Sequence, residues 1–375
     1  MTTRTTQAIQ IDRLGRPDIL VERTVPLRDP GEGEVHLRVV AAGLNFADLA
    51  MRMGLYGTVP SRPFSPGFEV AGEVGRVGPG VEGWREGDLA IALMRYGGYA
   101  RDVVLPAGQL FRYPSKLSAV EAAAVPVAFL TAWMCLFEVA RSRAGEVTLI
   151  LGAAGGVGSA AVQLARQAGL RVIGTAGGER KREFVKERLG AEACFDSRGD
   201  WETGVRGLLG ERGVDVALDA VGARATASCR RLLAPLGRIV FYGLSEAMPT
   251  RARNWPRVLW ALLRTPRFHP LSLVEPCIGI LGIHLLHLGR KESLLPPALA
   301  AISRGIETGE LRPIVDRTFP LTAAGAIAAH TYIHARHSMG KVVLAAGPAD
   351  GQAEAASVAP FSRVEADRGD ARDRE

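Results

Sequence analysis

The sequence predicts an α/β protein in which a doubly wound parallel sheet follows a β-rich domain. Strand-like and helix-like stretches alternate from residue 147 to residue 242, which is the pattern of a parallel sheet covered by helices on both faces. Residues 1–126 instead contain short apolar stretches separated by glycine turns, which is typical of a compact β-rich domain. A chain of 375 residues is long enough for two domains.

The β-rich part is predicted from three stretches and ends at a helix signal. Strands are expected over 35–41 and 89–93, and within the glycine-containing stretch 67–81. Ser118 followed by Glu121 has the spacing of a capping box, so a helix is expected to begin there. A second helix is expected over 132–139, before the break at residues 144–145.

The alternating part begins after that break. The expected strands are 147–151, 171–175, 193–195, 214–219 and 237–242, and the helices between them are 158–168, 181–189, 201–209 and 224–233. Residues 246–275 interrupt the alternation with arginines interleaved among tryptophans and leucines. A further strand over 277–285, a helix over 294–308 and a last strand over 340–345 follow, and residues 347–375 have the composition of a disordered tail.

Composition and charge exclude several classes of function. The net charge is +7, but the basic residues are scattered, without a Lys/Arg block among aromatics or a zinc-finger spacing, so no nucleic-acid partner is expected. The four cysteines contain no C-x-x-C pair, which suits a reducing compartment. The first ten residues lack an apolar signal core, and no stretch is expected to reach the roughly eighteen apolar residues of a spanning helix. We therefore expect a cytoplasmic protein.

A glycine-rich turn follows the first strand of the alternating part. It consists of Ala153, Ala154, Gly155, Gly156, Val157 and Gly158 and leads directly into a helix. Phosphates bind helix N-termini, where N–H groups are unpaired and the helix dipole is positive, and glycine lets the backbone approach them closely. The strand before the turn and the helix after it predict a nicotinamide dinucleotide site. The alternative is a strand-to-helix turn without a ligand.

The end of the next strand indicates which dinucleotide is bound. NAD sites place a carboxylate at this strand tip for the ribose 2′-hydroxyl, but here the strand ends at Thr175 without one. Arg180, Lys181 and Arg182 follow soon after, and cations there suit a 2′-phosphate. The sequence therefore predicts NADPH, held in part by Thr175, Arg180 and Lys181. The alternative is a solvated helix start.

Several motifs together resemble a known superfamily. Four segments resemble the zinc-independent quinone oxidoreductase branch of the medium-chain dehydrogenase/reductase superfamily. They are the run from Gly43 to Asp48, the segment Pro66–Glu69, the Ala-Ala-Gly-Gly-Val-Gly turn and the closing strand from Gly340 to Leu344. The nearest likeness within it is to VAT-1-like proteins, through the Gly-Leu-Asn-Phe-Ala-Asp-Leu run and the element 282–285. The resemblance implies a GroES-like catalytic domain over 1–129 and 309–346 and a Rossmann domain over 130–308.

The departures from the zinc-dependent relatives matter for the chemistry. Zinc alcohol dehydrogenases of this superfamily have a cysteine ligand where Asn45 stands and a histidine ligand where Phe68 stands, so no metal is expected. Glu69 corresponds to an acid beside that metal and is given no catalytic role. His330, His334 and His337 are interpreted as surface histidines of an amphipathic helix rather than metal ligands.

The resemblance also implies where the reaction takes place. It positions Asn45 and Tyr56 near the nicotinamide, where either can donate a hydrogen bond to a carbonyl oxygen, although Asn45 could be a turn residue and Tyr56 a packing residue. Thr131 resembles a contact to the nicotinamide ribose, or it caps a helix turn. Gly243 and Leu244 follow a parallel strand and so face the cofactor. Asp48 and Arg52 could form a helical ion pair.

The function expected is NADPH-dependent hydride transfer to a quinone or conjugated enone by a metal-free homodimer. The alternative is a VAT-1-like membrane-associated or regulatory nucleotide-binding protein. The basic amphipathic segment 251–268 could lie on an anionic membrane, cover the substrate cleft or form a dimer contact.

Overall fold

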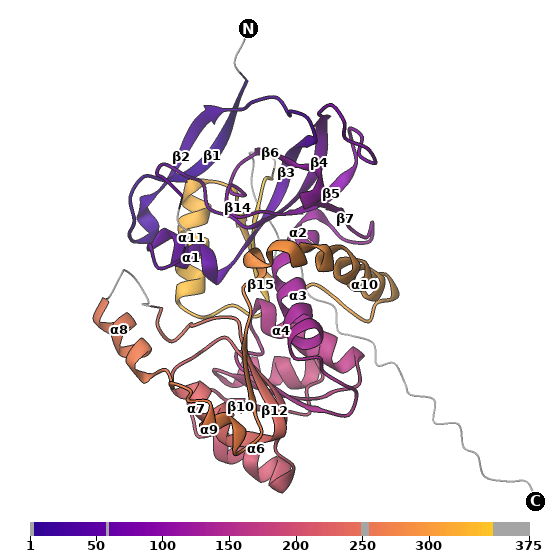
Figure 1. The fold of residues 1–375 in the computed structure, drawn as a ribbon. Coiled ribbons are helices and arrows are strands. Elements are labelled where there is room, and N and C mark those ends of the chain that lie inside the picture. The colour runs from indigo at the N-terminus through magenta and orange to yellow at the C-terminus, as the bar shows by residue number, and fades with distance from the viewer. Residues whose placement is uncertain (1–3, 58–59, 249–254, 348–375) are drawn as a thin grey trace, which may run out of the picture.

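The computed structural model describes residues 4–57, 60–248 and 255–347. Two large β-sheets and one two-stranded sheet organise these residues, with one large sheet in the indigo-to-purple upper half of Figure 1 and the other in the pink lower half. The chain crosses from the upper half to the lower half and returns to the upper half for its last described strands. The predicted tail over 347–375 lies outside the described residues after Gly347.

The upper sheet has the order β14-β15-β3-β4-β5-β7, and β6 also pairs with β3. Its long strand β3 (Glu34–Leu44) pairs antiparallel with β4 (Glu69–Val77) and with β15 (Lys341–Ala345), so the end of the chain completes the sheet that the beginning starts. The other strands are β5 (Leu89–Leu93), β6 (Asp102–Pro106), β7 (Leu110–Arg112) and β14 (Val315–Pro320), beside an antiparallel pair of β1 (Thr5–Ile11) and β2 (Leu20–Pro26).

The lower sheet is parallel throughout and has the order β10-β9-β8-β11-β12-β13. Its strands are β8 (Val147–Ile150), β9 (Arg171–Ala176), β10 (Ala193–Asp196), β11 (Val214–Asp219), β12 (Leu233–Phe241) and β13 (Gly279–Gly282). Numbered from β8, this is the 3-2-1-4-5-6 order of a doubly wound Rossmann sheet, which confirms the predicted fold class. The order reverses between β8 and β11, and ligands of such sheets bind at that switch point.

Helices cover both sheets and connect them. They are α1 (Phe46–Arg52), α2 (Ala119–Ala122), α3 (Pro126–Trp133), α4 (Gly156–Gln167), α5 (Glu179–Glu183), α6 (Trp201–Leu209), α7 (Arg224–Leu232), α8 (Trp255–Arg264), α9 (Leu271–Val274), α10 (Leu295–Thr308) and α11 (Ala323–His334). π-Helical turns extend α3 over Met134–Val139 and α5 over Phe184–Arg188, and short 3-10 turns lie at Pro17–Ile19, Ala107–Gln109, Gly210–Arg212, Leu285–His287 and Gly289–Leu294.

Most predicted elements are confirmed, with shifted ends. The capping box before α2 is present, because the Glu121 backbone N–H donates to Ser118 Oγ at 3.3 Å and the Ser118 N–H donates to the Glu121 carboxylate at 3.0 Å. The strand expected over 277–285 is limited to β13, because the chain turns into a 3-10 turn at residues 285–287. The strand expected over 237–242 begins four residues earlier, at the start of β12.

One helical run corrects the expectation about spanning segments. The run Ala119–Val139, which includes α2 and α3, is 21 residues long and apolar enough to cross a membrane, although the sequence predicts no stretch of that length. Its most apolar 18-residue window is 72% buried inside the protein. Its apolar side chains pack in a core that residues of both sheets share, from Ala41 and Ala71 above to Val216 and Val240 below. Burial therefore accounts for the composition of this run.

Candidate functional site

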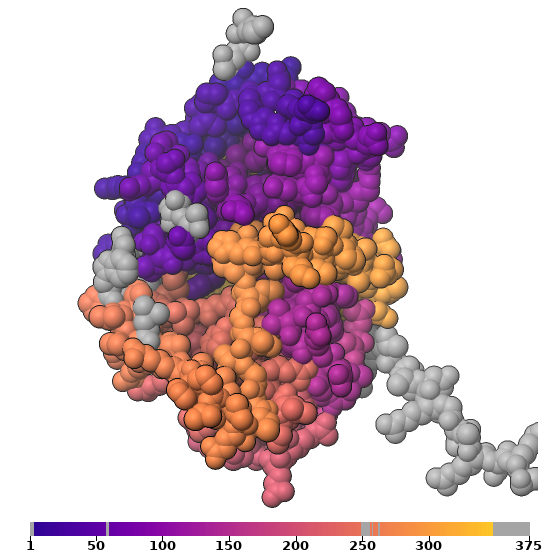
Figure 2. Space-filling model, viewed as in Figure 1, coloured from indigo at the N-terminus to yellow at the C-terminus, as the bar shows by residue number. Residues whose placement is uncertain are grey.

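A cavity of about 740 Å³ lies where the two halves meet. Loops that follow β3, β8 and β12 line it, together with α3 and the segment after β13. It brings together nine of the residues predicted from the sequence: Asn45, Tyr56, Thr131, Gly155, Gly156, Val157, Gly158, Gly243 and Leu244. It does not include Ala153, Ala154, Thr175, Arg180 or Lys181 among its lining residues. Figure 2 shows the orange segment between α9 and α10 running across the junction of the two halves.

The glycine turn that follows β8 is built by close backbone packing. A Cβ atom on Gly158 would come within 2.3 Å of the Gly152 carbonyl oxygen, so only glycine allows this approach. Ala153 and Ala154 are buried beneath the turn, and the Ala153 N–H donates to the Thr175 carbonyl oxygen at 2.9 Å. The Thr175 hydroxyl accepts from the Gly152 N–H at 3.3 Å. These three residues therefore shape the turn from behind and do not face the cavity.

The start of α4 fits the pyrophosphate of a dinucleotide. Gly155 is the N-cap of this twelve-residue helix and makes no side-chain capping bond. The first N–H groups of a helix have no partner within the helix, and here Gly156, Val157 and Gly158 of that first turn line the cavity. Unpaired donors and the positive end of the helix dipole favour an anion at this point.

Cations gather beyond the turn, at the end of β9. The Lys181 ammonium donates to the Arg336 carbonyl oxygen at 2.7 Å. Burial, with the positive charges of Arg198 and Arg336, holds the pKa of Lys181 below its usual value, and Asp316 partly offsets this. A Cβ atom on Gly177 would lie 3.4 Å from the Arg198 Nε, so the Arg198 guanidinium lies against the strand end. Sequence reasoning missed both Arg198 and Arg336.

The other predicted cations differ in their surroundings. Arg180 is exposed at the start of α5, beside Lys181. Arg182 instead pairs with Asp196 at 3.0 Å, so its charge is already matched within the protein. Arg180, Lys181 and Arg198 are therefore the candidate contacts for a 2′-phosphate at the end of β9.

Asn45 is held by a buried network under the cavity. Its Nδ2 donates to Glu69 Oε1 at 2.8 Å, and its Oδ1 accepts from the Lys341 ammonium at 2.7 Å. Lys341 also donates to Glu69 Oε1 at 2.6 Å and to the Leu44 carbonyl oxygen at 2.8 Å. The Val127 N–H donates to the other Glu69 oxygen at 2.7 Å. Asn45 therefore starts α1 and also presents a fixed amide at the cavity wall.

This network does not fit a zinc ion. Glu69 is fully buried, and the cation beside it is the Lys341 ammonium. Asn45 and the buried Phe68 occupy the positions that would have to supply zinc ligands, and neither is a usual ligand of zinc. Among the residues described, no group of three or more His, Cys, Asp or Glu side chains is arranged to hold a metal. Glu69 is therefore a buried structural carboxylate.

The cavity wall also carries Tyr56 and a histidine that comes from far along the chain. The Tyr56 hydroxyl lies 2.9 Å from His284 Nε2, and its ring contacts the Phe68 ring at a centroid distance of 5.4 Å. Burial raises the pKa of Tyr56 to about 12, with a smaller contribution from Asp48. Burial also lowers the pKa of His284, helped by His287, whose ring stacks on it at 3.9 Å. In the sequence, His284 was noted only within the element 282–285 that resembles VAT-1-like proteins, so its contact with Tyr56 was missed.

The segment after β12 closes the cavity from below. Gly243 and Leu244 follow the strand into the lining, as predicted for residues at the carboxyl end of a parallel strand. Met248, which follows β12, and Val258 of α8 also line the cavity, so residues of the interrupting segment cover the cleft. Residues 249–254 of this segment lie outside the described residues.

Two expectations about α1 and α11 are wrong. His330 and His334 are not surface residues, because their exposed fractions are 0% and 8%. They contact the buried Arg52, whose Nε donates to His330 Nδ1 at 3.3 Å and whose second terminal nitrogen lies 2.6 Å from His334 Nε2. Asp48 does not pair with Arg52, since its carboxylate accepts from the backbone N–H groups of Asn45 and Gly67. The helix α11 therefore presents its histidines to a buried arginine.

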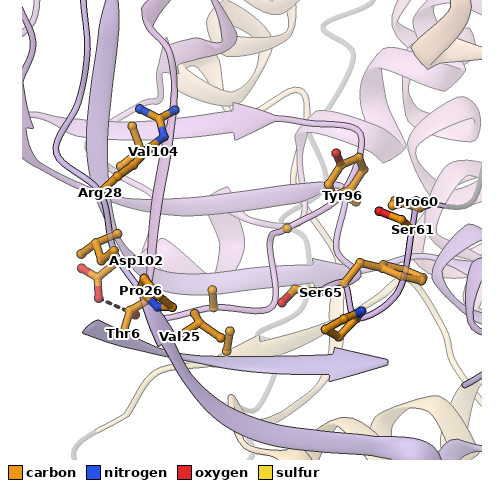
Figure 3. Close-up of a pocket in the computed structure, with 16 residues that line it drawn as sticks. Thr6, Val25, Pro26, Arg28, Pro60, Ser61, Ser65, Tyr96, Asp102 and Val104 are labelled. Carbon is orange, nitrogen blue, oxygen red and sulfur yellow. Dashed lines mark hydrogen bonds between the residues drawn. The ribbon is translucent and has the colours of Figure 1, made fainter. Parts of the chain in front are cut away.

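A second cavity, of about 400 Å³, lies in the upper half against β1, β2 and β6 (Figure 3). Its charged side chains already have partners within the protein. Asp102 accepts from the Thr6 hydroxyl at 2.8 Å and lies 2.8 Å from His36 Nε2, and Arg28 pairs with Glu34. We therefore place the candidate site in the first cavity.

Comparison with known proteins places these features among dehydrogenases and reductases. Residues 31–115 match the family model of the alcohol dehydrogenase GroES-like domain, and residues 156–262 match that of the zinc-binding dehydrogenase. The human synaptic vesicle membrane protein VAT-1 homolog is 35% identical over 324 residues, which are 85% of this chain and 80% of that protein. A quinone oxidoreductase from Sus scrofa is 30% identical over 340 residues, which are 90% of this chain and 97% of that protein.

A solved structure adds a cofactor to the comparison. A mycobacterial protein determined in complex with NADPH superimposes with a TM-score of 0.79 at 29% identity, covering 90% of this chain and 99% of that one.

Proposed function

The chain belongs to the medium-chain dehydrogenase/reductase superfamily, in its VAT-1-like branch, and from that premise we propose that it is an NADPH-dependent oxidoreductase that transfers hydride to a quinone or conjugated enone without a metal. One observation carries the proposal. The same cavity has the glycine turn on one wall and Asn45 and Tyr56 on the other, so a dinucleotide on the turn would face two hydrogen-bond donors.

The choice of NADPH rests on the cations at the end of β9. Lys181 and Arg198 lie together there, and a 2′-phosphate would supply the negative charge that this cluster favours. The backbone of the turn would hold the pyrophosphate, and Thr131 of α3 would lie toward the nicotinamide ribose. The similar mycobacterial protein solved with NADPH supports this choice.

The chain's own residues would position and activate the substrate. NADPH supplies the hydride when it is bound. The Tyr56 hydroxyl donates a hydrogen bond to the substrate carbonyl oxygen, and the raised pKa of Tyr56 keeps that proton in place until negative charge develops. Asn45 also offers its amide, which Glu69 and Lys341 orient. Apolar residues such as Phe68, Leu285 and Leu286 limit water around the reacting atoms.

Metal independence and substrate class are tested together. Protein dialysed against a chelator is expected to oxidise NADPH in the presence of an ortho- or para-quinone or a conjugated enone, measured by the loss of nicotinamide absorbance. Adding Zn²⁺ should not raise the rate. NADPH that binds, by fluorescence titration, without turnover across the whole panel would contradict the enzyme proposal, and turnover that requires Zn²⁺ would contradict its metal-free form.

A second candidate function follows from the outer face of α8. Leu259, Trp260 and Leu263 are exposed there at 58%, 44% and 67%, and the Arg264 guanidinium lies 3.9 Å over the Trp260 ring. Apolar side chains beside arginine suit the surface of an anionic membrane, and relatives of this chain are named as synaptic vesicle membrane proteins. Sedimentation with phosphatidylserine vesicles that is lost in a Trp260→Ala/Leu263→Ala variant would support this candidate. Absence of sedimentation by the unaltered protein would remove it.

We also propose that the protein is a cytoplasmic homodimer. Strand β13 ends the lower sheet, and its outer edge has no partner strand among the residues described. Leu281 on it is 38% exposed. Pairing of two β13 edges would cover this backbone. Light scattering should give twice the mass of the chain, and Leu281→Lys should give the monomer, because a charged side chain on each exposed edge disfavours edge-to-edge pairing. A monomer without the substitution would contradict the proposal.

A further inference from the structure

The contact between Tyr56 and His284 gives the proposed reduction a source of protons. We propose that His284 is the positioning residue of Tyr56: its Nε2–H donates to the Tyr56 oxygen, leaves the hydroxyl hydrogen free for the substrate, and replaces that hydrogen after transfer. This inference rests on the proposed function, because it assigns a role in the same reaction.

The geometry holds the two groups together. Tyr56 follows α1 in the upper half, and His284 follows β13 in the lower half, 228 residues later, yet their polar atoms lie 2.9 Å apart at the cavity wall. Rings on both sides fix their orientation. Phe68 packs on Tyr56 at 5.4 Å, and His287 stacks on His284 at 3.9 Å with an interplanar angle of 13°. The pair therefore spans the junction at which the substrate would bind.

Only one tautomer of His284 makes Tyr56 useful to the substrate. A phenol has a single hydrogen to donate, and a neutral imidazole has one N–H and one bare nitrogen. If Nε2 were bare, it would accept the Tyr56 hydrogen, and no donor would remain for a carbonyl. If Nε2 carries the hydrogen, it donates to the Tyr56 oxygen, and the hydroxyl is directed into the cavity. The lowered pKa of His284 keeps the ring neutral at neutral pH, as this arrangement requires.

The proton that the reduction consumes comes from solvent. The enone gains a hydride at its β-carbon, its C=C π electrons move toward the carbonyl, and the carbonyl oxygen takes the Tyr56 hydrogen. The Tyr56 oxygen takes the hydrogen of His284 Nε2, and Nδ1 of the exposed ring takes one proton from water. The imidazole passes from one neutral tautomer to the other, and the enol becomes the saturated ketone. Before the next turnover Nε2 takes a proton from solvent and Nδ1 releases one, which restores the starting tautomer without a net change in protons. One NADPH, one proton and one enone give NADP⁺ and one saturated ketone.

Substitutions separate this role from packing. His284→Ala should lower kcat for an enone by about tenfold to a hundredfold, while the KM for NADPH stays within about twofold. Free imidazole should restore much of the rate. In a Tyr56→Phe background the same substitution should cause little further loss, because the two residues act in one chain. His269→Ala is the matched control, since it removes an exposed histidine that does not line the cavity, and it should retain the full rate.

Two results would overturn the inference. One is a His284→Ala variant with an unchanged kcat, or with a loss that imidazole does not restore and that multiplies with the loss from Tyr56→Phe. The other is nitrogen NMR of the unaltered protein showing a bare His284 Nε2, where the inference expects Nε2 to be protonated. The NMR result does not depend on turnover. Failure of the proposed function would be seen separately, as an unaltered protein that oxidises no NADPH with any quinone or enone.

Discussion

Two clusters that contain cations flank the candidate site, and they differ in what balances the positive charge. Under the cavity, Lys341 is buried and lies 2.6 Å from the Glu69 carboxylate, with further acceptors on Asn45 and Leu44. At the end of β9, burial and the nearby cations Arg198 and Arg336 lower the pKa of Lys181, and Asp316 offsets this only in part. The first cluster is complete without a ligand and supports the wall of the site. The second accumulates positive charge, as a binding site for an anion does.

The largest effect is expected from removing Lys341, the cation of the cluster under the cavity. Lys341→Met would leave the Glu69 carboxylate buried without its cation, and breaking a buried pair in this way costs about 3–5 kcal/mol of unfolding free energy. Urea unfolding followed by circular dichroism measures the loss. The double variant Lys341→Met/Glu69→Gln is the control and should recover part of the stability, because the buried charge is gone. A loss below about 1 kcal/mol in the single variant, the size of an exposed pair, would show that the pair is not structural.

A third buried cation sharpens the comparison, because its partners are neutral. Arg52 contacts His330 and His334, and burial, with the positive charge of Arg52, lowers the pKa of His334 from its ordinary value of 6.5 to about 4. Between pH 6.5 and pH 4, His334 is therefore protonated in the unfolded chain and neutral in the folded chain. This contribution to stability is present above pH 6.5 and is lost as the pH falls toward 4. Its size is about 3 kcal/mol for a shift of this extent.

The pH effect is measured as a difference between proteins. The pKa of the buried Asp48 is raised to about 7, which adds an opposite slope, so unfolding free energies of the unaltered protein and of His334→Gln are compared from pH 7 to pH 4. The unaltered protein should lose more stability than the variant over this range. Parallel curves would show that His334 does not titrate against Arg52.

Substitutions in the cluster at the end of β9 should change the preference for NADPH over NADH rather than the free energy of unfolding. Lys181→Ala and Arg198→Ala should each weaken NADPH by about 1–3 kcal/mol, roughly the value of a charge-assisted hydrogen bond, and leave NADH almost unchanged. Isothermal titration measures both affinities. Lys186→Ala, an exposed lysine in the turn after α5 that lies near Glu187, is the matched control and should change neither affinity. Equal weakening of NADPH and NADH would contradict the 2′-phosphate assignment.

Sequence reasoning succeeds where the determinants are local. The strand, the glycine turn and the start of α4 lie within a dozen residues, and the steric need for glycine at 158 acts on the turn itself. The alternation of strands and helices likewise predicts a parallel sheet, because each crossover is short. For this reason the amino-acid sequence alone is enough to assign residues such as Gly155 and Gly243 to the cavity.

It fails where residues from distant segments meet. His284 reaches Tyr56 across 228 residues, and Arg198 and Arg336 approach Lys181 from the turn after β10 and from the end of α11. The histidines of α11 show the same limit. Their spacing predicts that they share one face of a helix. Only the fold shows that Arg52 of α1 is buried against that face.

The central claim is that hydride from NADPH reaches a quinone or enone in a cavity shaped by Asn45 and Tyr56, without a metal. Its most direct measurement is steady-state turnover by chelator-dialysed protein, unaltered and Tyr56→Phe, with NADPH and an enone. We expect turnover by the unaltered protein and a loss of about a hundredfold or more in kcat for the variant, with NADPH affinity retained. An unaltered protein that binds NADPH but reduces nothing in the panel, or a Tyr56→Phe variant as fast as the unaltered protein, would contradict it.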